Sequence, residues 1–225
     1  MFPLVNVSLT VISKVVMADV WKVARAVAKL SDGEIVIIGG LATYLHVQRR
    51  PRAALPLEAT HDVDATISAV ASSSLRDRYE FTENPRLHKV QVRVEGIDVD
   101  LYPQHISRLR FAYVDLAPYA QRYRGLKIAA IPHILLLKLD AIEDRGSSGK
   151  GAKDRRDAAK LLVLLRGSPQ ARKLLAALAA PSDLVDLRAV VKSPAFVEIV
   201  HGNAKAAAVL RKQAQEAIDA VTGMS

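Results

Sequence analysis

Cysteine is absent from this chain of 225 residues, which excludes disulfides, thiolate metal ligands and cysteine nucleophiles. Aromatic residues make up only 5%, so the core is expected to consist of Val, Leu, Ile and Ala. No segment approaches the roughly 20 apolar residues of a membrane span. Met1 to Val16 is apolar, with Lys14 as its only charge, and lacks the pattern of a signal peptide. These absences predict a soluble, cytoplasmic protein without a membrane partner.

The charge of the chain is positive and unevenly distributed. The formal net charge is +9, and residues 121–180 hold 13 Lys and Arg against 5 Asp and Glu, a net charge of +8. A localised basic region is the electrostatic footprint expected of a nucleic-acid or polyphosphate partner. A solvated basic helical surface is the alternative, and the charge count leaves both open.

Hydrophobic periodicity divides the chain into two parts, residues 1–130 and residues 131–225. The first part mixes helices with short apolar strands, and the second shows helical periodicity alone. The predicted strands are Glu34–Ile38, His61–Ser68, Tyr79–Thr82, Lys89–Glu95, Ile97–Tyr102 and Gly125–Ala130. The predicted helices are Val11–Leu30, Leu41–Gln48, Ser72–Asp77, Ile134–Asp144, Lys153–Arg166, Arg172–Ala179, Leu184–Val191, Ala195–His201 and Ala204–Val221. The sequence therefore predicts an α+β fold, with a small mixed β-sheet and flanking helices followed by an α-helical C-terminal half.

Three local features refine this prediction. Ser72 or Ser73 is expected to cap the short helix that follows, and Glu95-Gly96 is expected to form a hairpin turn. Arg145 to Ala152, rich in Gly, Ser and Lys, is expected to be a mobile loop. That segment lacks the spacing of a phosphate-binding loop and does not follow a strand, so a nucleotide site is not expected there.

A glycine pair and two aspartates form the most informative motif. Gly39 and Gly40 end an apolar strand and open a helix, where glycine allows a tight turn and a close approach to a ligand. Asp62 and Asp64 lie one residue apart on the next strand, so their side chains share one face. Paired carboxylates suit Mg²⁺, and a glycine-rich helix start suits phosphate. The pattern therefore indicates chemistry on a nucleotide.

A later strand carries a second Asp-x-Asp, Asp98 and Asp100. Asp100, flanked by Val99 and Leu101, is the better candidate for a third metal-binding carboxylate, although parity alone leaves Asp98 open. Three converging carboxylates could hold one or two Mg²⁺ ions. The alternative is that these aspartates lie at strand ends and face water.

The order of these motifs resembles the nucleotidyltransferase superfamily. The segments that carry the resemblance are Ile38-Gly39-Gly40-Leu41-Ala42-Thr43-Tyr44-Leu45 and Thr60-His61-Asp62-Val63-Asp64-Ala65-Thr66-Ile67, then Asp100, Lys138, Arg145 and Lys153-Asp154-Arg155-Arg156-Asp157. The branch that it resembles is the AbiEii/MenT-type toxins of type IV toxin–antitoxin pairs. The resemblance runs from about Glu34 to Leu165.

This resemblance implies a Mg²⁺-dependent, pyrophosphate-releasing transfer from an NTP. It implies metal binding and catalysis by Asp62, Asp64 and Asp100, catalytic roles for Lys138 and Asp154, and nucleotide contacts from Gly39, Gly40, Thr60, Lys138 and Arg145. It also implies a tRNA 3′ end as acceptor, held by the basic surface 121–180, a block of translation, and an antitoxin that phosphorylates Thr60.

The residues themselves leave alternatives open in the second part. Lys138, on an otherwise apolar helix, either extends to water or points into a polar cleft. Asp154 shares a helix face with Asp157, so it could orient Lys138, contact the active site or simply favour the helix start.

One residue departs from the family pattern: Glu58 occupies a position where the family often has Arg. The candidates to replace the phosphate contacts of the family's arginine are Arg49, Arg50 and Arg52. Two other functions stay open. One is nucleotidyl transfer to a small molecule, such as an antibiotic, or to a protein. The other is an inactive module that binds nucleic acid or an antitoxin.

Overall fold

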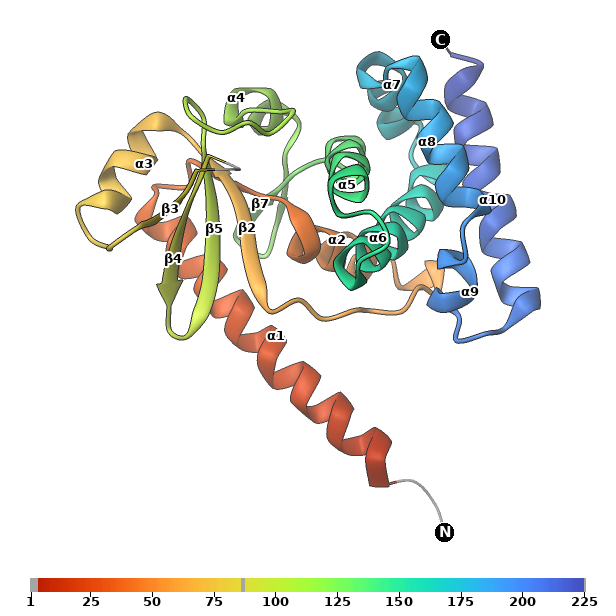
Figure 1. Cartoon of the computed structure of the whole chain (residues 1–225), viewed down its shortest axis with the longest axis horizontal. Helices are drawn as coiled ribbons and strands as arrows, with labels where there is room; N and C mark the ends of the chain where they lie inside the picture. The colour runs from red at the N-terminus through yellow and green to blue at the C-terminus, as the bar shows by residue number, and fades with distance from the viewer. Residues whose placement is uncertain (1–3, 86–87, 225) are drawn as a thin grey trace. The chain divides into compact units, whose positions relative to one another are not determined.

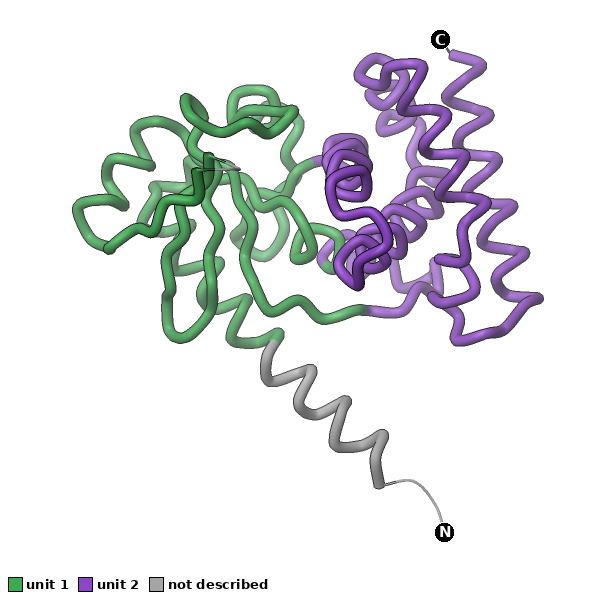
Figure 2. The backbone as a smooth tube through the Cα atoms, in the orientation of Figure 1, with its two compact units in different colours: residues 1–44, 58–129 green, residues 45–57, 130–225 purple. Residues whose placement is uncertain are grey.

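The computed structural model describes the backbone of residues 4–85 and 88–224, and the side chains of those ranges from residue 17 onward. The chain forms two compact units (Figure 2). Unit 1 consists of Met1–Tyr44 and Glu58–Ala129, and unit 2 consists of Leu45–Leu57 and Ala130–Ser225. Each unit has its own core.

Unit 1 is built on a mixed sheet whose described strands run in the order β3-β4-β5-β2-β1-β7-β6 (Figure 1). The strands are β1 Ile35–Ile37, β2 Asp62–Ile67, β3 Thr82–Asn84, β4 Lys89–Val94, β5 Ile97–Pro103, β6 Gln121–Tyr123 and β7 Leu126–Ile128. β1 is antiparallel to β2 and parallel to β7, and β2 is parallel to β5. β3 with β4, β4 with β5, and β6 with β7 are antiparallel pairs.

Helix α1, Leu4–Leu30, packs against β2, β5 and β7. Its buried residues Val20, Val23 and Val27 recur at the spacing of one helix face, which explains why this segment folds as an amphipathic helix. The strands bury alternate residues, such as Val63 and Ala65 of β2, because strand side chains point to opposite faces. Aliphatic residues therefore make the core of unit 1, as the low aromatic content predicts.

The remaining helices of unit 1 are short. They are α3 Ala69–Arg76, α4 Tyr113–Leu116 and the 3-10 turn η2 Ala117–Tyr119. α3 begins at Ser68, whose hydroxyl accepts a hydrogen bond from the Ala71 N–H at 3.1 Å. The prediction that Ser72 or Ser73 caps this helix is therefore wrong, because Ser68 at the end of β2 already satisfies the first turn.

Unit 2 is helical. Its helices are α5 Ile131–Arg145, α6 Gly149–Arg166, α7 Pro169–Leu178, α8 Pro181–Lys192, α9 Ala195–Ile199 and α10 Ala204–Thr222. α6 is the central helix, since it packs against α5, α7, α8, α9 and α10 and buries most of its last two turns. The end of α2, Gly39–Gln48, and the 3-10 turn η1, Pro51–Ala53, also belong to this unit.

The predicted α+β class, with a mixed sheet followed by helices, is confirmed. The predicted mobile loop is wrong over much of its length, because Ser148 caps α6 and the helix already begins at Gly149. β6 was not predicted, since its polar residues form a strand only by pairing with β7. Among the described residues, no helix is both long and apolar enough to cross a membrane.

Candidate active site

The start of α2 lies against β2 within unit 1. The Ile38 N–H donates to the Asp64 carbonyl at 2.9 Å, which fixes the end of β1 beside β2. Gly39 follows with φ +63°, and a Cβ built there would overlap the Asp64 carboxylate and lie 2.9 Å from both its Cβ and Cγ. Only glycine fits this position, because both the backbone angle and the space exclude a side chain. The first N–H groups of α2, which have no partner inside the helix, therefore begin directly beside a carboxylate.

The two Asp-x-Asp motifs lie in register on neighbouring strands. Asp62 pairs with Asp98 and Asp64 with Asp100 across the parallel β2–β5 ladder, so all four side chains share one face. Asp100 is buried, whereas the Asp98 side chain is 54% exposed and lies 3.7 Å from Arg93. Burial therefore distinguishes Asp100 from Asp98, whereas their parity along the strand could not.

Asp100 is held by two residues of β4 that sequence reasoning missed. Lys89 makes an ion pair with Asp100 Oδ2, and the Gln91 amide donates to Oδ1 at 2.9 Å. The signal for Gln91 was present, because the two-residue turn at Glu95-Gly96 fixes the register that places Gln91 opposite Asp100. Lys89 was harder to find, since it reaches Asp100 from a neighbouring register position.

This arrangement suits Mg²⁺ only in part. The donors are carboxylate oxygens, the ligands that Mg²⁺ prefers, and Mg²⁺ often takes just one or two carboxylates together with substrate phosphates. Asp62 and Asp64 fit that role. Both oxygens of Asp100, however, already have partners in Lys89 and Gln91. Within the described part of the chain, no three His, Asp or Glu side chains gather as a metal-ligand group.

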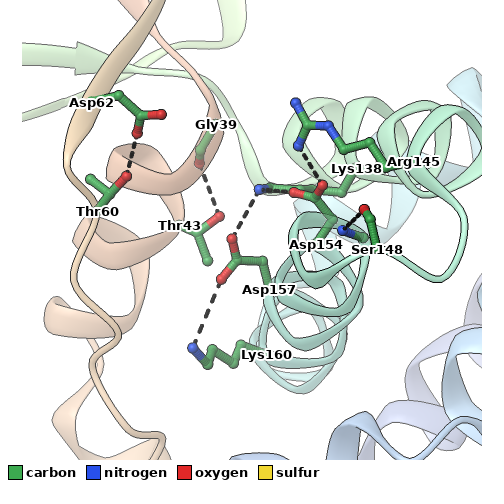
Figure 3. A network of polar contacts seen from close by, with 11 residues as sticks. Gly39, Thr43, Thr60, Asp62, Lys138, Arg145, Ser148, Asp154, Asp157 and Lys160 are labelled. Atoms are coloured by element: carbon green, nitrogen blue, oxygen red, sulfur yellow. Dashed lines mark hydrogen bonds and ion pairs between the residues drawn. The ribbon is translucent and has the colours of Figure 1, made fainter. Parts of the chain in front are cut away.

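Thr60 positions Asp62 (Figure 3). Its hydroxyl donates to Asp62 Oδ1 at 2.5 Å, and its N–H lies 3.3 Å from Met17 Sδ. The residue is only 1% exposed. In this structure Thr60 therefore orients a carboxylate, and its hydroxyl must be uncovered before any enzyme could modify it.

Unit 2 contains a buried ion network between α5 and α6 (Figure 3). Lys138 Nζ lies 2.6 Å from Asp154 Oδ1 and 2.9 Å from Asp157 Oδ2. The Arg145 guanidinium lies 2.5 Å from the other Asp154 oxygen, and Lys160 lies 3.8 Å from Asp157. Asp154, Asp157 and Lys160 are each at most 3% exposed. Asp154 thus orients Lys138, which is one of the alternatives that its helix position left open.

The protonation of Lys138 follows from this network. Burial alone would lower its pKa, but the charges of Asp157 and Asp154 and the hydrogen bonds to them outweigh burial and raise the pKa above its ordinary value. Lys138 is therefore charged at neutral pH, and two carboxylates balance its charge. Its predicted contact with a triphosphate stays a prediction.

The turn between α5 and α6 is tightly built. Ser148 Oγ accepts from the Gly151 N–H at 3.1 Å, and Arg155 donates to the Gly146 carbonyl at 2.8 Å. A Cβ at Gly151 would overlap that same carbonyl, so glycine is required inside the first turn of α6. This packing places Arg145 beside Asp154, and the Arg145 side chain remains 39% exposed.

The basic residues of segment 121–180 are divided between the two units. Arg122, Arg124 and Lys127 belong to unit 1, whereas the other ten basic residues belong to unit 2. Several of these ten serve internal contacts: besides the ion network, Arg156 pairs with Glu198, Arg166 pairs with Glu216, and Arg172 donates to main-chain carbonyls. A charge count along the sequence could not reveal these partners.

Within unit 2, three arginines near residue 50 line one cavity together with a distant arginine of α6. An open cavity of about 980 Å³ is lined by Arg49, Arg50, Arg52 and Arg166. Arg50 donates to the Leu164 carbonyl at 3.1 Å, and a Cβ at Gly167 would lie 3.1 Å from its guanidinium. Arg50 therefore caps the end of α6, which is a structural role.

Two solved structures with TM-scores of 0.50 or more share this fold. The JHP933 protein of Helicobacter pylori has a TM-score of 0.52 at 16% identity, covering 92% of this chain and 94% of its own. A candidate nucleotidyltransferase of H. pylori has a TM-score of 0.50 at 14% identity, covering 93% and 97%. An antigenic nucleotidyltransferase-like protein of Paracoccidioides brasiliensis has a TM-score of 0.49 at 18% identity, covering 80% and 91%. No family profile and no curated protein matches the sequence.

At these identities the likeness establishes the fold alone. Unit 1, with its seven described strands and carboxylates in register at the centre of the sheet, belongs to a chain with a nucleotidyltransferase-type fold. The resemblance seen in the sequence is thus confirmed at the level of the fold.

Substituting Gly39 tests the close approach to Asp64. Gly39→Ala should destabilise the protein by about 1–2 kcal/mol through the left-handed backbone and by about 1–3 kcal/mol more through overlap with Asp64. Gly33→Ala is the matched control, because Gly33 has φ +73° but open space around its Cβ. Urea denaturation measures both, and equal losses would show that the contact with Asp64 has no energetic weight.

Removing the Lys138 charge tests the ion network. Lys138→Met should lower the unfolding free energy by about 3–5 kcal/mol, because it removes the cation that two buried carboxylates share and leaves them only Arg145 and Lys160. The exposed Lys205→Met on α10 should stay within about 0.5 kcal/mol of the original protein.

The pH dependence has a definite sign. Since the folded pKa of Lys138 is raised, its contribution is fully present below the unfolded value of about 10.4 and declines only as the pH rises beyond that. The difference between Lys138→Met and the original protein should therefore be the same at pH 7 and pH 9. A difference that shrinks within this range would contradict the assignment.

Proposed function

We propose that this protein is a Mg²⁺-dependent nucleotidyltransferase whose nucleotide site lies on unit 1. The observation that carries the proposal is the contact between Gly39 and Asp64, which sets the start of a helix beside a carboxylate. A helix start binds phosphate through its N–H groups, and a carboxylate binds the metal that accompanies phosphate. A site that provides both is suited to a nucleoside triphosphate.

Each residue of unit 1 has a defined role in this proposal. The N–H groups of Gly39 and Gly40 bind the triphosphate, Thr60 orients Asp62, and Asp62 with Asp64 holds the metal. When bound, Mg²⁺ supplies positive charge that neutralises the phosphates. Asp100 would receive the proton of the acceptor hydroxyl, which must first replace Lys89 or Gln91 at one carboxylate oxygen, as the acceptor oxygen bonds to the α-phosphorus. The bond from the α-phosphorus to the bridging oxygen breaks, and pyrophosphate leaves.

The resemblance to the AbiEii/MenT-type toxins extends the proposal to the acceptor and the partner. It suggests transfer to the 3′ end of tRNA, which stops translation, in a cytoplasmic protein controlled by an antitoxin. By this resemblance Lys138 and Arg145 are the candidate nucleotide-binding cations of unit 2, and phosphorylation of Thr60 would place a second anion beside Asp62. The Arg145 side chain is 39% exposed, which supports its role because part of it is accessible to an anionic ligand.

The dispersed basic residues favour a second candidate. A small acceptor needs no extended basic surface, and part of the charge of segment 121–180 serves internal ion pairs. Nucleotidyl transfer to a small molecule with a hydroxyl group therefore remains the rival reaction, and the same assay distinguishes the two.

Transfer of label tests the reaction. The purified protein with Mg²⁺ and each α-labelled NTP should label tRNA, while EDTA abolishes the transfer. Asp64→Asn should reduce it at least 100-fold, because the metal loses a ligand. Asp98→Asn removes the same charge from the same sheet face at an exposed position and should keep most of the activity. Label on an aminoglycoside but not on tRNA would favour the rival. No label on tRNA, small molecules or protein would refute the proposal.

Lys89 gives a separate test of the metal. Lys89→Gln leaves Asp100 without its counter-cation on a strand next to Asp62 and Asp64, so repulsion among the carboxylates should lower the stability without metal. Mg²⁺ would relieve that repulsion, so its addition should raise the melting temperature of Lys89→Gln more than that of the original protein. An equal shift in both proteins would indicate that Asp100 and the metal site are independent.

A further inference from the structure

The single tryptophan of the chain lies in an aromatic and cationic cluster of unit 1. Trp21 on α1 meets Tyr123 of β6 edge to face, with ring centroids 6.4 Å apart and planes at 86°. The Arg124 guanidinium lies 5.8 Å from the Trp21 centroid and 5.4 Å from that of Tyr123. Trp21 is half-buried, so part of its indole ring remains accessible.

An open cavity of about 550 Å³ adjoins this cluster. It is lined by Trp21, Lys22, Arg25 and Lys29 on α1, and by Gly33 and Gly125. No acidic residue is among its lining residues. A Cβ at Gly33 would contact nothing within 4 Å, and one at Gly125 would meet only Arg25 Nε at 3.9 Å, so the mouth of the cavity is open on that side. The cavity thus combines an aromatic ring with cations and free space.

The cations here are available to a ligand. The side chains of Arg25 and Lys29 make no hydrogen bond or ion pair with any residue that the structure describes, and both residues are exposed. Lys22 differs, since it lies 2.7 Å from Glu95, which raises its pKa chiefly through the hydrogen bond. Arg25 and Lys29 therefore carry positive charge that no described carboxylate neutralises.

The position of Arg124 comes at a conformational cost. Arg124 and Gly125 form the two-residue turn between β6 and β7, and both have positive φ, +48° and +87°. Such turns favour Asn or Asp before Gly, because a long side chain is disfavoured in the left-handed region. The turn nevertheless holds an arginine, whose guanidinium lies over two aromatic rings. This is unfavourable for the backbone alone, and it adds a cation to the cluster.

We propose that this surface, the Trp21 platform formed by Trp21, Arg25, Lys29, Tyr123 and Arg124, binds single-stranded RNA. Base stacking on an aromatic ring together with cations along the phosphates is the usual recognition of single strands. The cations match the phosphates of the strand, and the aromatic ring provides a stacking surface for a base. The platform also differs from the nucleotide site, because Gly33 precedes β1 whereas Gly39 follows it. The platform deepens the proposed function by binding a strand that is part of the acceptor. In this respect alone it rests on the proposed function.

Trp21 itself reports the binding. Titration with a single-stranded adenylate 12-mer, without NTP, should quench the tryptophan fluorescence saturably. Arg25→Gln/Lys29→Gln should weaken binding about tenfold and lower the salt slope by about 1.4, since each phosphate contact on a single strand contributes about 0.7. Lys205→Gln/Lys212→Gln removes the same charge from exposed positions of α10 and should change neither value.

A second variant separates stacking from charge. Trp21→Ala should weaken binding about tenfold when measured by anisotropy of a labelled strand, and Trp21→Phe should restore most of the loss, because phenylalanine keeps an aromatic face. Circular dichroism shows whether both variants fold. If Trp21→Ala unfolds, the fluorescence titration and the charge variants still decide the question.

Three outcomes would overturn the proposal. They are binding by anisotropy without quenching, a duplex of the same length that quenches as strongly, or equal weakening by both double variants. Asp64→Asn should retain full quenching, because the platform does not use the nucleotide site. Quenching without transfer of label would therefore refute the nucleotidyl transfer and support RNA binding at the platform. Transfer of label without quenching would support the reaction and refute RNA binding at the platform.

Discussion

The close approach of the α2 start to β2 is the constraint on which the candidate site depends. A helix placed that near a strand must begin with a residue that has no Cβ and tolerates a positive φ, and Gly39 meets both conditions. The consequence is electrostatic. The unpaired N–H groups of the helix and the carboxylates of β2 lie side by side, where each favours a different part of a metal-bound phosphate. Because side chains alternate along β2 and β5, Asp62, Asp98 and Asp100 then lie on the same face of the sheet as Asp64.

In unit 2, a buried ion network determines how two helices pair. Lys138, Arg145, Lys160, Asp154 and Asp157 join α5 to α6, and the set carries one excess positive charge. Such networks seldom add stability over a well-packed apolar core, but they penalise any arrangement that separates the partners. This network therefore fixes how α5 pairs with α6.

The sequence predicted what depends on local rules and missed what depends on partners. Periodicity located β2, β4, β5 and most helices, and turn chemistry located the hairpin at Glu95-Gly96. It could not show that Lys89 neutralises Asp100, or that Arg166 and Arg156 face glutamates of distant helices. Charge counting fails here for a physical reason: a side chain has the same formal charge whether it faces water or a carboxylate. β6 was missed for a related reason, since its polar residues become a strand only through β7.

The composition of unit 2 has a consequence for how the chain is made. Leu45–Leu57 lies between two segments of unit 1, yet it packs with helices that begin at Ala130. During synthesis this segment emerges early, and more than seventy further residues must follow before its partners exist. Its apolar residues Leu45, Val47 and Leu55 therefore cannot be buried in their native core until those partners have been synthesised. For the same reason no single cut can separate the two units, so each must be studied as a part of the whole protein.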